Sequence, residues 1–120
     1  MELKEIHSDS RGQIYLLTGL LFFPEVTLFR THENTARGGC IHNINSEFIC
    51  VIEGEIEYVY GELLWKKRMV AGDSFVIPKE TPHYFLSKTS SLVAEWGATA
   101  EEKVKKHPLF RAIVNKINEK

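Results

Sequence analysis

Short segments in which apolar and polar residues alternate make up most of the chain. Alternation with a period of two is typical of strands that bury one face of a sheet. The segments are rich in Val, Ile, Phe and Tyr, and they are separated by Gly, Pro, Asn and Asp. The pattern predicts nine strands, over residues 13–17, 26–30, 39–42, 48–52, 56–60, 63–70, 74–77, 83–87 and 92–96. Nine short strands indicate an all-β barrel or sandwich.

The turn residues between these segments predict tight antiparallel connections. Glu53 and Gly54 are typical of a hairpin turn between two strands. Residues 71–73 and 78–82, which contain Gly, Asp and Pro, bracket a further short strand. We therefore expect consecutive strands to pair as neighbours at these turns.

Only the C-terminal part of the chain has a helical period. Pro108 suits the first turn of a helix, and apolar residues recur after it at spacings of three and four, from Leu109 to Ile117. The pattern predicts a short amphipathic helix over residues 108–119. Its apolar face is expected to pack against the outside of the barrel or to close one end, with a dimer contact as the alternative.

Composition narrows the class of protein. The chain has 120 residues, which predicts a single domain over residues 1–120. Apolar residues make up 43% and charged residues 26%, as in ordinary globular domains. The formal net charge of -1 argues against a dedicated nucleic-acid binder. No apolar run approaches the roughly 20 residues of a membrane span, so no membrane association is expected.

The N-terminal residues and the cysteines suggest a compartment. Residues 1–11 mix acidic and basic side chains and lack the apolar stretch of a secretory signal. We therefore expect a cytoplasmic protein in which Cys40 and Cys50 are reduced thiols.

Several polar residues that could bind a metal or take part in catalysis lie close together in the first half of the chain. Arg37, Cys40, His42 and Glu47 lie within eleven residues that run into a predicted strand. Because side chains alternate across a strand, Cys40 and His42 are predicted to share one face, and Glu47 can point back at them from the next strand. A buried Glu47 carboxylate would need a partner such as Arg37, a histidine or a water molecule.

A second imidazole, that of His83, follows a turn bounded by prolines. Two imidazoles and one carboxylate form a ligand set suited to Fe, Mn, Zn, Ni or Cu. Three such ligands on one side of a metal leave coordination positions open for a substrate. The sequence therefore predicts a divalent transition-metal site at His42, Glu47 and His83.

The spacing of these residues follows an ordered pair of motifs. In the first, four residues separate His42 from Glu47, and six separate Glu47 from Gly54. In the second, five residues separate a Gly from a Pro, and His83 falls in register. Across residues 37–96 this pattern resembles the paired motifs of the cupin superfamily. The resemblance implies a jelly-roll barrel, also called a double-stranded β-helix, here followed by a short C-terminal α-helix.

Several positions depart from the family motifs. Cys40 stands in place of the first His of the pair, Asn34 in place of the leading Gly, and Glu80 in place of a Gly of the second motif. A thiolate at Cys40 would be a soft fourth ligand and would favour Zn or Cu. A protonated, buried thiol would leave a three-ligand site of two histidines and one glutamate. The sequence leaves both alternatives open.

A second resemblance concerns three short segments, residues 9–14, 26–30 and 37–42. Their order is similar to that in the dTDP-sugar epimerase and 3,4-ketoisomerase branch of cupins, whose members work without metal and take their catalytic base from an Arg-Gly-x-His segment. Cys40 occupies that histidine position here. The resemblance therefore implies His42 as the base and Arg37 as the residue that stabilises negative charge.

Three functional hypotheses follow. The leading one is a pocket that binds a divalent metal through His42, Glu47 and His83, with or without Cys40 as a fourth ligand, and that holds or transforms a small polar molecule. The second is a metal-free nucleotide-sugar isomerase or epimerase that uses His42 and Arg37. The third is a non-catalytic, sugar-binding cupin, because a fold does not fix a function.

Other residues complete the expectations. Tyr58 and Tyr60 share a strand face and are candidates to line the pocket as hydroxyl donors. The three histidines outside the motifs, His7, His32 and His107, are expected at the surface. The resemblance implies a homodimer, for which the predicted outward apolar residues are Ile41, Phe48 and Ile52.

Overall fold

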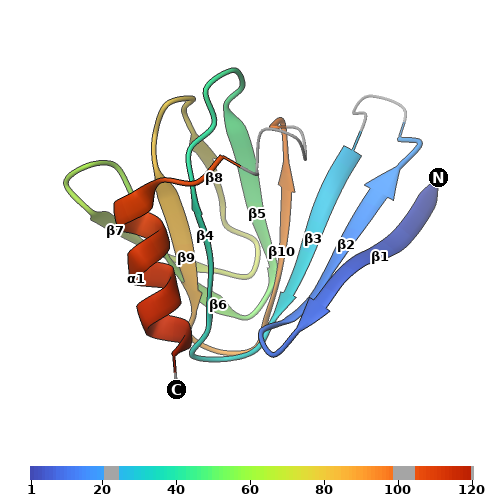
Figure 1. Cartoon of the computed structure of the whole chain (residues 1–120). Helices are drawn as coiled ribbons and strands as arrows, with labels where there is room; N and C mark the ends of the chain where they lie inside the picture. Colours follow the sequence, from blue (N-terminus) through green and yellow to red (C-terminus); the bar gives the residue numbers. More distant parts are fainter. Residues whose placement is uncertain (21–24, 99–104, 120) are drawn as a thin grey trace.

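The computed structural model of the chain describes residues 1–20, 25–98 and 105–119, and it confirms the all-β prediction. Ten strands and one helix lie within these residues (Figure 1). The first five strands are β1 (Glu2–Asp9), β2 (Gly12–Thr18), β3 (Glu25–Thr31), β4 (Ala36–Cys40) and β5 (Glu47–Glu53). The next five are β6 (Glu55–Tyr60), β7 (Trp65–Val70), β8 (Ser74–Ile77), β9 (His83–Ser87) and β10 (Ser91–Trp96), and α1 (Pro108–Asn118) follows them.

The strands form two antiparallel sheets that face each other across the interior (Figure 1). The larger sheet has the order β1-β2-β3-β10-β5-β8, and the smaller sheet has the order β4-β9-β6-β7. From β3 onward the chain passes from one sheet to the other at every connection except the β6–β7 hairpin. This alternation between sheets is the jelly-roll topology that the motif resemblance implied.

The predicted pairing at several turns is wrong. β5 and β6 belong to different sheets, so Glu53 and Gly54 do not form a hairpin turn but carry the chain from one sheet to the other. Gly54 has a φ of 85°, and a Cβ there would collide with the carbonyl oxygen of Ser90. The turns at residues 71–73 and 78–82 also cross between the sheets. A turn signal marks where a strand ends, but it does not say which strand the next one pairs with.

Two strands differ from the sequence prediction. β1 was missed because its residues are mostly polar and exposed, and it pairs only with β2 at the edge of the large sheet. β4 spans Ala36–Cys40 rather than residues 39–42. Its register shifts between Gly38 and Cys40, and both glycines at its end, Gly38 and Gly39, have positive φ angles. His42 consequently lies beyond the strand and does not share a strand face with Cys40.

Strands β6 and β9 of the small sheet are buried on both faces, and each face has its own core. The inward face contributes Tyr58 and Phe85 to a cluster between the two sheets. The outward face contributes Val59 and Tyr84 to a second cluster, which includes Phe110 of α1. Inward and outward residues alternate along β6 and β9, as the period of a strand requires. Helix α1 therefore covers the outside of the small sheet, as predicted (Figure 1).

Helix α1 also holds β4 through polar contacts. The Asn118 side chain accepts a hydrogen bond from the Ala36 amide at 2.7 Å and donates one to the Ala36 carbonyl at 2.9 Å. Nη1 of Arg111 donates to the carbonyl of Gly38 at 2.8 Å. His107, predicted as a surface residue, is the half-buried N-cap of the helix, and its Nδ1 accepts from the Phe110 amide. These contacts fix the strand that leads into the candidate site.

Three further expectations concern the surface and the thiols. Phe48 and Ile52 are exposed, Ile41 is half-buried, and Phe48 stacks on Trp96. The homodimer itself stays a prediction.

Cys40 and Cys50 are both thiols rather than partners in a disulfide. Among the described residues, the only helix is too short and too polar to cross a bilayer.

The helix contact leads to a stability prediction. Replacing Phe110 by Ala removes a fully buried ring, and we expect the free energy of unfolding to fall by about 3–5 kcal/mol. The matched control is Leu109→Ala, since Leu109 is 52% exposed on the same helical turn and should change stability by less than about 0.5 kcal/mol. Urea denaturation measures both. Equal losses in the two variants would contradict the packing described here.

Candidate functional site

Three ionisable side chains meet inside the barrel, as the sequence predicted. His42, Glu47 and His83 are 3%, 1% and 4% exposed. One ligand atom from each, an imidazole nitrogen or a carboxylate oxygen, lies within 4.8 Å of the other two. The two imidazole rings are edge to face, with centroids 4.8 Å apart. This group of His42, Glu47 and His83 is called the His-Glu-His cluster below.

The carboxylate of Glu47 stands between the two imidazoles. Oε2 of Glu47 lies 3.7 Å from Nδ1 of His42, and Oε1 lies 3.7 Å from Nε2 of His83. These distances are longer than direct hydrogen bonds of ordinary length. Of the partners expected for a buried Glu47, the structure places an imidazole on each side of the carboxylate.

The hydrogen bonding of His83 favours a metal-binding tautomer. Nδ1 of His83 lies 3.0 Å from the carbonyl oxygen of Thr81, which can only accept a hydrogen bond. A neutral His83 therefore carries its proton on Nδ1, and Nε2 presents a lone pair toward Glu47. In metal sites, a hydrogen bond from the other ring nitrogen to a carbonyl oxygen commonly orients the imidazole that binds the metal.

Each member of the cluster comes from a different segment. Glu47 is the first residue of β5 and His83 the first residue of β9, both as predicted. His42 lies in the connection after β4, where its carbonyl accepts a hydrogen bond of 2.6 Å from the Glu80 amide. That bond joins the connection after β4 to the connection before β9, and it brings the two imidazoles to the same end of the barrel.

The positions that depart from the cupin motifs keep the backbone shape of the motif glycines. Asn34 and Glu80 have φ angles of 63° and 67°, in the left-handed region that favours glycine. Asn tolerates this region comparatively well, whereas Glu is rare in it. The substitutions therefore change the side chains without changing the turns, and Glu80 carries backbone strain beside the cluster.

A cavity of about 420 Å³ opens beside the cluster. Its lining includes all three cluster residues together with Tyr58, Phe85, Phe29 and Cys40. Tyr60, the other tyrosine proposed from the sequence, is not among the lining residues. A concave, largely apolar space of this volume with a few polar groups is typical of a small-molecule site.

One cross-strand row forms the floor of the cavity. Arg37, Phe85 and Tyr58 are register partners on β4, β9 and β6, so their side chains point to the same face of the small sheet. The Tyr58 ring stacks on the His83 ring, with centroids 6.0 Å apart. The Tyr58 hydroxyl is buried without a hydrogen-bond partner among the described residues, and burial raises the pKa of Tyr58.

Cys40 lines the cavity outside the cluster. It is half-buried on β4, and its sulfur is not among the atoms grouped within 4.8 Å. Burial raises the pKa of the Cys40 thiol from its ordinary value of 9.0, with a smaller opposing effect from Lys106. In the metal-free protein the thiol is therefore protonated at neutral pH, and the position of its sulfur outside the cluster favours the three-ligand alternative.

Arg37, predicted as the group that stabilises negative charge, lies inside the barrel and lines the cavity. It is 3% exposed, and its guanidinium carbon lies 5.7 Å above the Phe29 ring. Burial lowers the pKa of Arg37 from 12.5 to about 10, so the side chain remains a cation at neutral pH.

Several charged residues of the cavity were not predicted from the sequence. Glu95 is 5% exposed and lies between Thr27 and Ile49 in the register of the large sheet. An acidic residue on the inward face of an otherwise apolar strand is the signal that could have identified it. The cavity is also lined by Arg11, Arg111 and Lys106.

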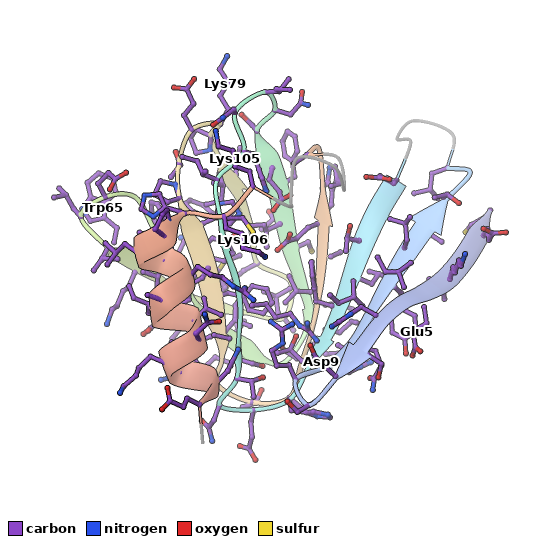
Figure 2. All side chains as sticks on the ribbon, in the orientation of Figure 1. Glu5, Asp9, Trp65, Lys79, Lys105 and Lys106 are labelled. Atoms are coloured by element: carbon purple, nitrogen blue, oxygen red, sulfur yellow. The ribbon has the colours of Figure 1, made fainter. Side chains whose placement is uncertain are left out.

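Lys106 of the cavity and Asp9, the partner of the cavity residue Arg11, lie in different parts of the fold. Figure 2 labels Lys106 on the segment that leads into α1, and Asp9 at the end of β1. Asp9 receives hydrogen bonds from the Arg11 guanidinium, which hold the pKa of that carboxyl well below its usual range. The charge of Arg11 is therefore already balanced. His7, expected at the surface, is exposed but lines the cavity and contacts Asp9 at 2.8 Å.

Comparison with protein families gives one match. The family model of the cupin domain matches residues 29–98, which include the three cluster residues and Arg37. No curated protein sequence matches the chain.

Comparison with solved structures gives many folds of the same kind. The capsular polysaccharide assembling protein CapF from Staphylococcus aureus is 13% identical, with a TM-score of 0.71, and covers 82% of this chain. This chain spans only 29% of the length of that CapF chain. KdgF from Halomonas sp. is 15% identical over 84% of this chain and 91% of its own, with a TM-score of 0.63.

A eukaryotic structure shares the fold as well. The Drosophila melanogaster CENP-C cupin domain is 15% identical over 81% of this chain and 76% of its own, with a TM-score of 0.65. Identities this low support a common fold, but they do not transfer the functions of these proteins to this chain.

The left-handed backbone at Glu80 leads to one prediction. Glu80→Gly should relieve the strain. Glycine also raises the conformational entropy of the unfolded chain, which offsets part of this gain, so we expect the free energy of unfolding to rise by about 0.5–1 kcal/mol. The neighbouring control is Lys79→Gly at an exposed residue without a positive φ, which should lose stability. Urea denaturation decides, and a loss in both variants would show that the Glu80 backbone is not strained.

The buried hydroxyl of Tyr58 leads to another. Tyr58→Phe removes a polar group that lacks a hydrogen-bond partner among the described residues, so we expect the ligand-free protein to gain about 1 kcal/mol of stability. Tyr60→Phe makes the same chemical change at a half-buried residue of the same strand and should change stability by less than about 0.5 kcal/mol. Thermal unfolding compares them, and a loss of stability in Tyr58→Phe alone would mean that this hydroxyl is hydrogen-bonded.

Proposed function

Because this chain belongs to the cupin family, we propose that its barrel binds one divalent transition-metal ion through the His-Glu-His cluster and holds a small polar molecule beside that ion. The observation that carries the proposal is the convergence of His42, Glu47 and His83, buried and within 4.8 Å, at the wall of a cavity of about 420 Å³. A buried carboxylate flanked by two imidazoles costs several kcal/mol of desolvation, which a bound cation would offset.

The donor set fits such an ion. Two imidazole nitrogens and one carboxylate oxygen are common ligands of Fe, Mn, Ni, Cu and Zn, and the hydrogen bond from His83 to Thr81 supports the required tautomer. A bound ion would supply Lewis acidity, which polarises an oxygen atom of the held molecule. With three protein ligands, such an ion would keep coordination positions open for the held molecule.

The surrounding residues have separate roles in this proposal. Phe85 and Phe29 give the cavity apolar walls that exclude water and strengthen polar interactions inside it. The Tyr58 hydroxyl can donate a hydrogen bond to the held molecule. Cys40, protonated and outside the cluster, contributes volume and an apolar contact rather than a ligand atom.

A metal-free nucleotide-sugar isomerase or epimerase is the second candidate. The observation in its favour is that His42 and Arg37, the base and the charge-stabilising group of that hypothesis, line the same cavity. The fold similarity to CapF, described as a capsular polysaccharide assembling protein, is compatible with a carbohydrate ligand. The thiol of Cys40 at the usual histidine position argues against an unchanged mechanism of that branch. A non-catalytic sugar-binding cupin is the third.

The metal proposal predicts stoichiometric binding that depends on the cluster. After incubation with Fe, Mn, Ni, Cu or Zn and removal of excess ion, elemental analysis should find about one ion per chain, as for a mononuclear site. His42→Ala and His83→Ala should each lose it. The control is His32→Ala, which removes an exposed imidazole outside the cavity and should leave the metal content unchanged.

Chelation separates the candidates further. A chelator should lower the unfolding temperature of the wild type but not of His83→Ala. An ion at a free concentration of 100 times its Kd stabilises the folded state by about 2.7 kcal/mol, and the chelator removes this stabilisation. A protein that takes up no metal, ignores the chelator and is stabilised by a thymidine or uridine diphosphate sugar would contradict the metal proposal and support the second candidate. Sugar binding without turnover would support the third.

A further inference from the structure

We propose that the molecule held in the cavity is an anion, whose carboxylate or phosphate group binds the Arg37 guanidinium. The inference rests on the proposed function, since it names the class of ligand that the same cavity takes. It comes from the charge and the hydrogen bonds of Arg37, not from the metal-binding residues.

Arg37 is a buried cation whose hydrogen-bond partners are neutral. Its Nε donates to Oγ1 of Thr31 at 2.8 Å, and its Nη2 donates to the carbonyl of Arg30 at 3.2 Å. Its Nη1 is buried and has no hydrogen-bond partner among the described residues. The guanidinium is thus held firmly on one side, and donors remain on the other.

The charge of Arg37 is not balanced by a nearby carboxylate. In the described part of the chain, no acidic side chain lies within 4.0 Å of its nitrogens, whereas Arg11, Arg30 and Arg68 all have such partners. Asp9 and, more weakly, Glu95 attract Arg37 only at longer range, and Arg11 repels it. A buried, unbalanced charge is costly, and an anionic ligand would supply the missing partner.

The position of Arg37 connects this charge to the site. Arg37 lies two strands from Tyr58 in the cross-strand row that forms the cavity floor, with Phe85 between them. Tyr58 in turn stacks on His83 of the cluster. A ligand that placed its anionic group at Arg37 would extend over Phe85 toward Tyr58 and the cluster.

The surroundings strengthen the interaction. Phe29 lies under the guanidinium and Phe85 beside it, so water is largely excluded. Charge-assisted hydrogen bonds in such an environment are shorter and stronger than neutral ones, and the planar end of a guanidinium suits both carboxylate and phosphate oxygens. The cavity volume of about 420 Å³ limits the ligand to a small molecule.

The test uses two anions and their neutral counterparts. Malate and glucose 6-phosphate are titrated into the metal-loaded and metal-free protein by calorimetry, with malamide and glucose as the uncharged counterparts. We expect at least one anion to bind more tightly than its counterpart, and to lose about 10- to 100-fold in affinity in Arg37→Gln. Malate alone would identify a carboxylate ligand, and glucose 6-phosphate alone a phosphate ligand.

The variants separate a binding role from a structural one. Arg37→Lys keeps the charge without the planar group and should retain part of the affinity. Thermal unfolding of each variant checks that it is folded before the affinities are compared. Arg68→Gln makes the same charge change at an exposed arginine paired with Glu55 and should bind as the wild type does. Unchanged affinity in a folded Arg37→Gln, or no preference for either anion over its counterpart, overturns the inference.

The same samples distinguish this inference from the metal proposal. Elemental analysis of each gives the metal content before titration. Stoichiometric metal without anion binding would leave the metal site standing and overturn the ligand class. Anion binding through Arg37 in a protein that takes up no metal would support the ligand class and contradict the metal site.

Discussion

The burial of the Glu47 carboxylate is the constraint on which the rest of the site depends. A carboxylate that is 1% exposed must be balanced inside the barrel, and the structure provides an imidazole 3.7 Å from each of its oxygens. His42 lies in the connection after β4 and His83 is the first residue of β9, and a backbone hydrogen bond from Glu80 to His42 joins the connections that lead to them. The two loops that meet at this end of the barrel thus place both imidazoles beside one buried carboxylate.

The small sheet connects helix α1 on the outside of the molecule to the cavity on the inside. Its outward side chains pack against helix α1, and its inward side chains form the cavity floor. Because residues alternate along each strand, the contacts that hold Ala36 to Asn118 also fix the direction of its neighbour Arg37. The position of a buried cation in the cavity thus depends on a helix that packs against the opposite face of the same sheet.

Much of the fold and part of the site could be predicted from the sequence. Alternation located nine strands, and motif spacing brought together His42, Glu47 and His83, because both depend on local order along the chain. The passage at Gly54 from one sheet to the other could not be predicted, since strand partners are set by contacts distant in sequence. Glu95 could have been found, since it is an acidic residue with the same alternation as Val93 on an otherwise apolar strand.

Anomalous diffraction from crystals of the metal-loaded protein, collected on both sides of the metal's absorption edge, tests the central claim most directly. The account predicts one strong peak at the centre of the His-Glu-His cluster, about 2.0–2.2 Å from one atom each of His42, Glu47 and His83. A peak at any other group of side chains, or an ordered cluster without a peak in crystals soaked with each candidate metal, would contradict it.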